Sequence, residues 1–196
     1  MRLIASAFLA LAIPALTVPA FAAPPAPPAA NAPRKSPEFT ILDPSGKQVL
    51  ISSFRGKVLV LPFMFTTCPH CQHEAQMLTK LQQEFGARGL QVLGTIFNDA
   101  NGPMAAQFVK EFGIGFPVGY ATRDSVISYL NISVMDRWVV PQVAVLDRKG
   151  NIVAQSLSTG TPELQDEAFM RNLIDKLLKE GTTTGTAAKK TVAKAN

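Results

Sequence analysis

The strongest constraint on the fold is a continuous apolar run, KVLVLPFMF (57–65), which leads directly into a helical pattern. A run without polar alternation is typical of a strand that is covered on both faces of a sheet. From Pro69 to about Phe85, apolar side chains recur every three or four residues, and Gly86 and Gly89 follow. This pattern predicts a helix that ends at the glycines. A buried strand that feeds a helix is the basic unit of α/β folds.

The same alternation continues along the chain. Strands are predicted at 39–43, 48–52, 90–97, 116–121, 142–147 and 152–157, and helices at 104–113, 124–130 and about 162–180. The first two strands flank the turn Pro44-Ser45-Gly46 and the last two flank RKGN, so each pair is expected to form an antiparallel hairpin. We therefore predict one α/β domain with a mixed central sheet, helices on both faces and an N-terminal β-hairpin extension.

Both ends of the chain lie outside this pattern. Residues 1–22 combine one basic residue, an apolar run and a small-residue cleavage site, which together indicate a secretory signal peptide. Residues 23–37 form a Pro/Ala-rich linker, 38–180 the folded domain, and 181–196 a basic tail that is expected to be disordered. The mature protein is therefore expected to be soluble and exported, periplasmic or otherwise outside the cytoplasm.

The net charge of +5 does not indicate a nucleic-acid-binding protein. Arg2 contributes one positive charge, and Lys189, Lys190 and Lys194 contribute three, which leaves +1 for the rest of the chain. A basic face for nucleic acid would need these charges clustered on the folded domain. No nucleic-acid partner is therefore expected.

The cysteines and histidines of the chain lie together in FTTCPHCQHE (65–74). Covalent haem attachment needs a histidine directly after the second cysteine, where this chain has Gln72. A zinc site could use Cys68, Cys71 and His73, but no cysteine or histidine outside this stretch would complete it. We therefore expect neither a metal nor another cofactor.

The spacing of the two cysteines favours a redox dithiol. Cys68 falls at the start of the predicted helix, where unpaired backbone N–H groups and the positive helix end stabilise a thiolate. Pro69 fits the first helical position, which needs no N–H, and a protonated His70 would stabilise the same thiolate. Cys68 is thus predicted to be the nucleophile and Cys71 the resolving thiol. A purely structural disulfide is disfavoured, because a two-residue gap closes too small a loop.

The stretch from FTILD to CPHC resembles the beginning of the exported thioredoxin-like disulfide reductases of the TlpA/ResA type, within the wider group that includes peroxiredoxins. The resemblance continues through FVKEFGIGFPV, VVPQVAVLDRKGNIVAQSLSTG and the last helix, and covers about residues 38–180. It implies a thioredoxin-like fold. It also implies that the substrates are protein dithiols or disulfides, and that a membrane partner donates or accepts the electrons. We expect the protein to be a monomer.

The resemblance also implies roles for three further positions. Glu74 matches the active-site glutamate of ResA-like proteins, and its helical spacing from Cys71 would let it act as an acid or base. Pro141 matches a proline that is cis in this fold and faces the dithiol, which would let the Val140 backbone pair with an extended substrate segment. Trp138 lies just before this loop and would either line the substrate groove or belong to the core.

Two departures from the family pattern matter. Relatives usually carry tryptophan where this chain has Thr67, so a hydroxyl replaces an apolar plate beside the nucleophile; we expect Thr67 and Pro69 to contact substrate. Pro62 stands where thioredoxins bury an aspartate. A proline in a central strand predicts a bulge or a lost hydrogen bond, and it shifts proton transfer toward Glu74 or water.

Two other functions stay open. Peroxiredoxin-like peroxidases resemble a pattern with threonine or serine three residues before the reactive cysteine, whereas Thr66 and Thr67 lie two and one before Cys68. A copper- or zinc-binding redox chaperone of this fold would have Cys-x-x-x-Cys and a distant histidine. The direction of exchange is also open, since the Pro-His pair favours oxidation and the family resemblance favours reduction.

Overall fold

The computed structural model describes residues 33–133 and 135–192, and for 181–192 it describes the backbone alone. The predicted signal peptide (1–22) and most of the predicted linker (23–37) lie outside these residues. Within the described part of the chain, no helix is long and apolar enough to cross a membrane.

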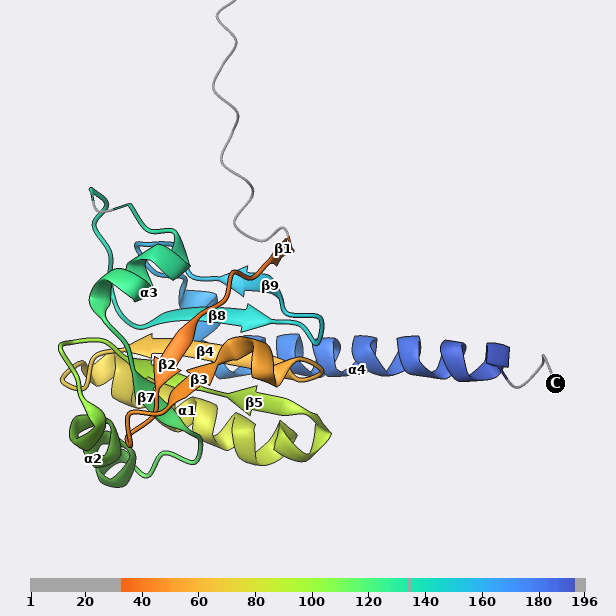
Figure 1. Cartoon of the computed structure of the whole chain (residues 1–196), viewed down its shortest axis with the longest axis horizontal. Coiled ribbons are helices and arrows are strands. Elements are labelled where there is room, and N and C mark those ends of the chain that lie inside the picture. Colours follow the sequence, from red (N-terminus) through yellow and green to blue (C-terminus); the bar gives the residue numbers. More distant parts are fainter. Residues whose placement is uncertain (1–32, 134, 193–196) are drawn as a thin grey trace, which may run out of the picture.

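A mixed β-sheet forms the centre of the fold (Figure 1). Its strands are β1 (Arg34–Lys35), β2 (Thr40–Leu42), β3 (Gln48–Leu50), β4 (Val58–Met64), β5 (Leu90–Val92), β6 (Gly94–Ile96), β7 (Val118–Tyr120), β8 (Gln142–Leu146) and β9 (Asn151–Gln155). Their order is β1-β9-β8-β4-β6-β7-β2-β3, and β5 also pairs with β4. β4 runs parallel to β5 and β6 and antiparallel to β8. The predicted mixed sheet and N-terminal hairpin (β2–β3) are confirmed.

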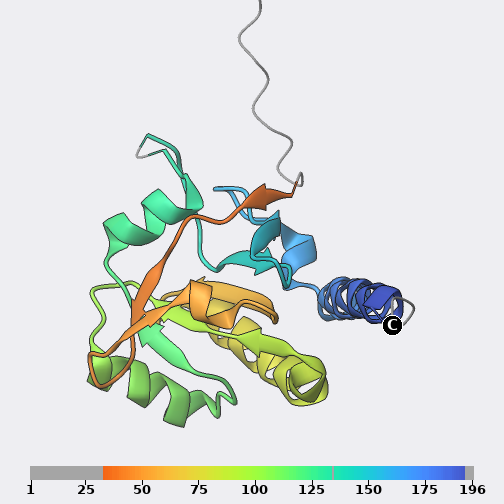
Figure 2. The same cartoon turned by 45° about the vertical axis from the view of Figure 1, so that its right-hand side comes forward.

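Helices cover both faces of this sheet (Figures 1 and 2). They are α1 (Pro69–Phe85), α2 (Gly102–Phe112), α3 (Arg123–Leu130) and α4 (Glu167–Val192), with the short 3₁₀ turns η1 (Ile51–Phe54), η2 (Gly86–Arg88) and η3 (Pro162–Gln165). Buried side chains of α1, α2 and α4 pack into one core, and those of α3 and the N-terminal hairpin pack into a second. The sheet separates the two cores, as the sequence pattern predicts.

β4 explains why its sequence shows no polar alternation. Every residue of this strand is buried. Its side chains alternate between the core under α1 (Val58, Val60, Met64) and the core under α3 (Leu59, Leu61, Phe63). Because both faces of the strand are covered, neither face requires polar residues.

Pro62 interrupts hydrogen bonding in the middle of the sheet. It lies opposite Val143 of β8. Val143 instead exchanges hydrogen bonds with Ser156, donating its N–H to Oγ at 3.0 Å and accepting the Ser156 N–H at 2.9 Å. The nitrogen of Pro62 therefore faces the edge of β4 that is opposite β8. On that edge lie β5 and β6, which are separated at Leu93. Because proline has no N–H, the ladder is interrupted here, and two strands form where the sequence pattern predicted one (90–97). This interruption is the lost hydrogen bond that a proline in a central strand predicts.

Three boundaries differ from the sequence prediction. Residues 34–35 were assigned to the linker, but they form β1, which pairs with β9. The last helix, predicted from about 162, begins as α4 only at Glu167, after η3. At its other end α4 continues to Val192, so the backbone of 181–192 is helical where a disordered tail was predicted. No proline interrupts this stretch, but its threonines and glycines are poor helix formers, so local propensity does not account for the continued helix.

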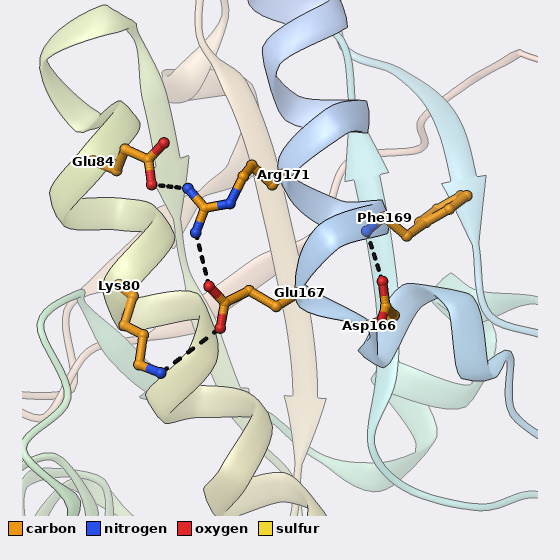
Figure 3. A network of polar contacts seen from close by, with 6 residues as sticks. All are labelled: Lys80, Glu84, Asp166, Glu167, Phe169 and Arg171. Atoms are coloured by element: carbon orange, nitrogen blue, oxygen red, sulfur yellow. Dashed lines mark hydrogen bonds and ion pairs between the residues drawn. The ribbon is translucent and has the colours of Figure 1, made fainter.

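Ion pairs join α4 to α1 on the surface of the fold (Figure 3). Arg171 of α4 pairs with Glu84 of α1 and with Glu167 of its own helix, and Lys80 lies 3.7 Å from the Glu167 carboxylate. Asp166 caps the helix by accepting the Phe169 N–H at 2.7 Å. Exposed pairs such as these contribute little, ~1 kcal/mol at most each. The buried apolar stripe of α4 therefore holds the helix in place.

Candidate active site at the start of α1

The turn between β4 and α1 places Cys68 at the N-cap of the helix. Its backbone is extended (φ −89°, ψ 117°), its carbonyl accepts the Gln72 N–H at 3.1 Å, and its side chain makes no capping bond. Pro69 begins the helix, at a position where a missing N–H costs nothing. Cys68 is half-buried, so its sulfur lies beside the positive helix end and can still be reached.

Cys71 lies one turn into α1 and is completely buried. Burial raises the pKa of the Cys71 thiol well above its usual range, against the lowering effect of the Phe65 backbone. The neighbouring Cys68 side chain and the charge of Glu74 raise this pKa further. The two free thiols are therefore unequal, with Cys68 open to attack a substrate and Cys71 kept protonated inside the protein.

Glu74 is buried beneath the same turn, with 2% of its surface exposed. Neither carboxylate oxygen has a hydrogen-bond partner among the described residues. Burial raises the pKa of Glu74 to about 8. Because the charge of Glu74 acts on Cys71, the Glu74 carboxyl lies close enough to exchange a proton with the Cys71 thiol. The sequence pattern left the burial of Glu74 open, and the structure places it inside.

The predicted proline loop lies against the nucleophile. The Val140–Pro141 bond is cis, as the resemblance implied. Cys68 Sγ lies 3.8 Å from the Val140 carbonyl oxygen. In the described part of the chain the Val140 N–H makes no hydrogen bond.

Gln142 anchors this loop from below, and sequence reasoning missed it. Its side chain is fully buried, and Nε2 donates to the carbonyls of Val139 at 2.8 Å and Ser158 at 3.2 Å. The Val139 N–H also donates to Ser158 O at 2.9 Å. The only signal in the sequence is a glutamine directly after the proline, at the start of a strand that is otherwise buried and apolar.

Asn98 anchors the other side of the motif. It accepts the Thr66 N–H at 3.2 Å and donates to Thr66 Oγ1 at 3.0 Å, while Gln72 donates to the Thr66 carbonyl at 2.9 Å. Asn98 follows β6, and the carboxyl ends of the neighbouring parallel strands β4 and β6 meet at one edge. That topology was the signal by which Asn98 could have been found. The next residue, Thr67, is exposed, as are Pro69 and His70.

Trp138 packs at the edge of the core under α3. It stacks on Phe97 at 5.7 Å between ring centroids and meets Phe65 edge-on at 5.9 Å. The Arg123 guanidinium lies 5.5 Å from the Trp138 centroid. Trp138 is half-buried, so of its two predicted roles the core role is present, and substrate contact stays a prediction. His73 is exposed on α1, away from this cluster.

One pocket of the described fold lies beside the dithiol motif, and a larger one lies elsewhere. A pocket of about 310 Å³ is bordered by Thr66, Thr67 and Gln72 of the motif and by residues of α2. A larger apolar cavity of about 500 Å³ lies between the N-terminal hairpin, α2 and β7. None of its lining residues comes from the dithiol or the proline loop. The larger cavity is therefore separate from the dithiol site.

The geometry offers no cluster for a metal. Among residues 33–133 and 135–192, no three histidine, cysteine, aspartate or glutamate side chains come together in a way that would hold an ion. A copper- or zinc-binding role therefore gains no support from the arrangement of side chains.

Curated relatives and solved structures agree with this arrangement. ResA of Bacillus subtilis (strain 168), a thiol-disulfide oxidoreductase, is 26% identical over 151 residues, which is 76% of this chain and 77% of ResA. ResA of Geobacillus kaustophilus is 24% identical over 131 residues, 67% of this chain and 71% of the relative. A thioredoxin-family thiol:disulfide interchange protein from Chlorobium tepidum TLS has a TM-score of 0.62 at 23% identity, covering 75% of this chain and 97% of that one.

A thiol:disulfide interchange protein from a Bacteroides species has a TM-score of 0.61 at 21% identity and covers 75% of this chain and 90% of its own. These neighbours establish the thioredoxin-like fold. The family model described as Redoxin matches residues 30–174, which span most of the described fold and include both cysteines. This chain therefore belongs to the redoxin family.

Proposed function

We propose that this thiol-disulfide oxidoreductase is exported from the cytoplasm and exchanges disulfides with protein substrates through Cys68 and Cys71. The observation that carries the proposal is the contrast between a half-buried Cys68 at a helix N-cap and a fully buried Cys71 one turn away. The Cys68 thiol can react with a substrate, whereas the Cys71 thiol can react only with Cys68. This division of roles is what a two-step exchange requires.

In the reducing direction, the Cys68 thiolate attacks one sulfur of a substrate disulfide. The substrate S–S bond breaks, one substrate thiolate leaves, and a Cys68–substrate disulfide forms. Cys71 then loses its proton and attacks the Cys68 sulfur, which releases the second substrate thiol and leaves a Cys68–Cys71 disulfide. The substrate gains two electrons, and a membrane partner would restore the dithiol. In the oxidising direction the same steps run in reverse.

Glu74 is the group that we assign to proton transfer in the second step. An ionised Glu74 can take the Cys71 proton inside the protein, where no water needs to enter. Its pKa of about 8 supports this role, because an acid or base works best when its pKa lies near the working pH. Pro62 occupies the strand position that would otherwise be open to an acidic side chain, which leaves Glu74 as the buried acid near Cys71.

The proline loop supports recognition of an extended substrate segment. The Val140 N–H, unpaired among the described residues, and the nearby Cys68 sulfur would let a substrate strand pair with the loop while its cysteine reaches the nucleophile. Thr67, Pro69 and Trp138 border the same region and are our candidates for further substrate contacts. Secretion is supported by the leader-like residues 1–22, which lie outside the described structure.

Insulin reduction by the purified mature domain tests the proposal. Cys68→Ser is expected to abolish the activity, and Cys71→Ser is expected to accumulate a mixed disulfide with the substrate. Full activity in Cys68→Ser would refute the proposal. Peroxide consumption that persists in Cys71→Ser would favour the peroxidase instead. A reduction potential of about −120 mV for the Cys68–Cys71 pair would identify an oxidase, and one of about −270 mV would identify a reductase.

A further inference from the structure

The pocket beside the dithiol has a mixed character that the exchange mechanism does not use. Its motif side consists of Thr66, Thr67 and Gln72, and its other side is α2. On α2, Met104, Phe108 and Phe112 recur at four-residue spacing and form an apolar floor, with the two phenylalanine rings 5.0 Å apart. The pocket is therefore open to a side chain that has an apolar stem.

The rim of the pocket carries an acidic group. Gln107 and Glu111 lie one turn apart on α2 and line the opening. Glu111 is exposed, and it is the only charged side chain among the lining residues. No ion pair or hydrogen bond joins the Glu111 side chain to another residue of the described chain. Its negative charge is available to a partner.

Both walls of the pocket are fixed. Thr66 is held through its N–H, hydroxyl and carbonyl by Asn98 and Gln72. The start of α2 is capped by Asn101, which accepts the Met104 N–H at 3.1 Å. A pocket between two anchored elements keeps its shape without a ligand, which lowers the entropic cost of binding.

We infer that this pocket is a selectivity subsite that accepts a lysine or arginine side chain located close to the reactive cysteine of the substrate. The inference rests on the proposed function. The aliphatic stem of such a residue would cover Met104, Phe108 and Phe112, and its charged end would reach Glu111 at the rim. Because Thr67 directly precedes Cys68, a side chain in this pocket positions the neighbouring substrate cysteine at the nucleophile.

Peptides with a single cysteine, activated as a 2-pyridyl disulfide, test the inference with the reduced protein. Cys68 attacks the peptide sulfur, the S–S bond breaks, and pyridine-2-thione leaves with the proton of the thiol and is followed by absorbance. The peptides carry lysine, norleucine or glutamate at each neighbouring position in turn. We expect the lysine peptide to react about two- to fivefold faster than the norleucine peptide, the size of an exposed ion pair.

The variants separate charge recognition from reactivity. Glu111→Gln is expected to remove the preference for lysine, and Glu111→Lys to reverse it in favour of glutamate. Added salt should shrink the wild-type preference. Glu84→Gln is the matched control, because it makes the same change on α1 at a residue that pairs with Arg171. The rate with 2,2′-dithiodipyridine, which has no side chain to place in the pocket, should stay the same in all three variants.

Two outcomes would overturn the inference. One is a wild-type protein that reacts equally with lysine and norleucine peptides, and the other is a lysine preference that survives Glu111→Gln. Neither outcome affects the proposed function, which stands or falls with insulin reduction by Cys68→Ser.

Discussion

At the scale of single residues, Glu74 is a buried acid whose two carboxylate oxygens have no hydrogen-bond partner among the described residues. A buried carboxylate without hydrogen bonds is costly when it is charged. The Glu74 carboxyl of the folded protein therefore stays protonated up to about pH 8. In the unfolded chain the same group ionises near its ordinary value of 4.5. Between these two values the folded state binds one proton more than the unfolded state. Stability therefore falls as the pH rises through this window.

Glu74→Gln should remove this pH dependence. Urea unfolding of the wild type is expected to show a loss of about 3 kcal/mol between pH 5 and pH 8, in addition to any change common to both proteins. The variant should lose much less over the same range, so its stability relative to the wild type should rise by about 3 kcal/mol between pH 5 and pH 8. Parallel curves for the two proteins across this range would contradict the assignment.

At the scale of elements, α1 and the strand before it are the parts that the sequence predicted best. The limits of α1, Pro69 and Phe85, follow from the local chain: a proline that can begin a helix, an apolar stripe and a closing glycine. The break at Leu93 was missed, because it depends on which strand Pro62 faces. Local patterns carry no information about such pairings.

The same distinction separates the site residues. Cys68, Cys71 and Glu74 follow at three-residue spacing from the N-cap into the first two turns of α1, so their positions in the sequence were enough to group them. Asn98 lies in the loop after β6 and Gln142 begins β8. Both act through polar side chains, and only the topology brings them to the motif. The pocket beside α2 was missed for this reason too.

Gln142→Leu tests the anchoring of the proline loop. The change leaves the Val139 and Ser158 carbonyls without the Nε2 donor, and we expect a loss of about 1–3 kcal/mol in urea unfolding. The looser loop should raise KM for insulin several-fold, while the rate of Cys68 with 2,2′-dithiodipyridine stays near that of the wild type. Gln142→Met is the companion variant, since it keeps a similar length and volume but has no donor. A KM that is unchanged in both variants would show that the loop needs no such anchor.

At the scale of the whole molecule, one group of polar contacts braces the fold at the end of the sheet away from the dithiol. Arg148, in the β8–β9 turn, donates to the carbonyls of Gly56 at 2.8 Å, Arg88 at 3.1 Å and Leu178 at 3.5 Å. These residues precede β4, end η2 and lie on α4. One side chain thus joins three segments that are distant in sequence, and Cys68 follows the opposite end of β4.

Arg148→Met should separate stability from activity. Three backbone carbonyls lose a charged donor, and we expect unfolding in urea to require about 2–3 kcal/mol less free energy. At a temperature where the variant is folded, its insulin reduction rate should equal that of the wild type. Lys149→Met is the control, because it removes an exposed neighbouring charge from the same turn. A large fall in the activity of folded Arg148→Met would contradict this separation.

Under the proposed function, strand pairing at the Val140 N–H would also decide when the protein can act on a client. A chain that has already folded offers its cysteines inside helices or paired strands, which cannot lie along the Val140 loop. A chain that has not yet folded still has free backbone on both sides of its cysteines. We therefore expect the enzyme to work during the maturation of its clients, and a client that has reached its final shape to escape it.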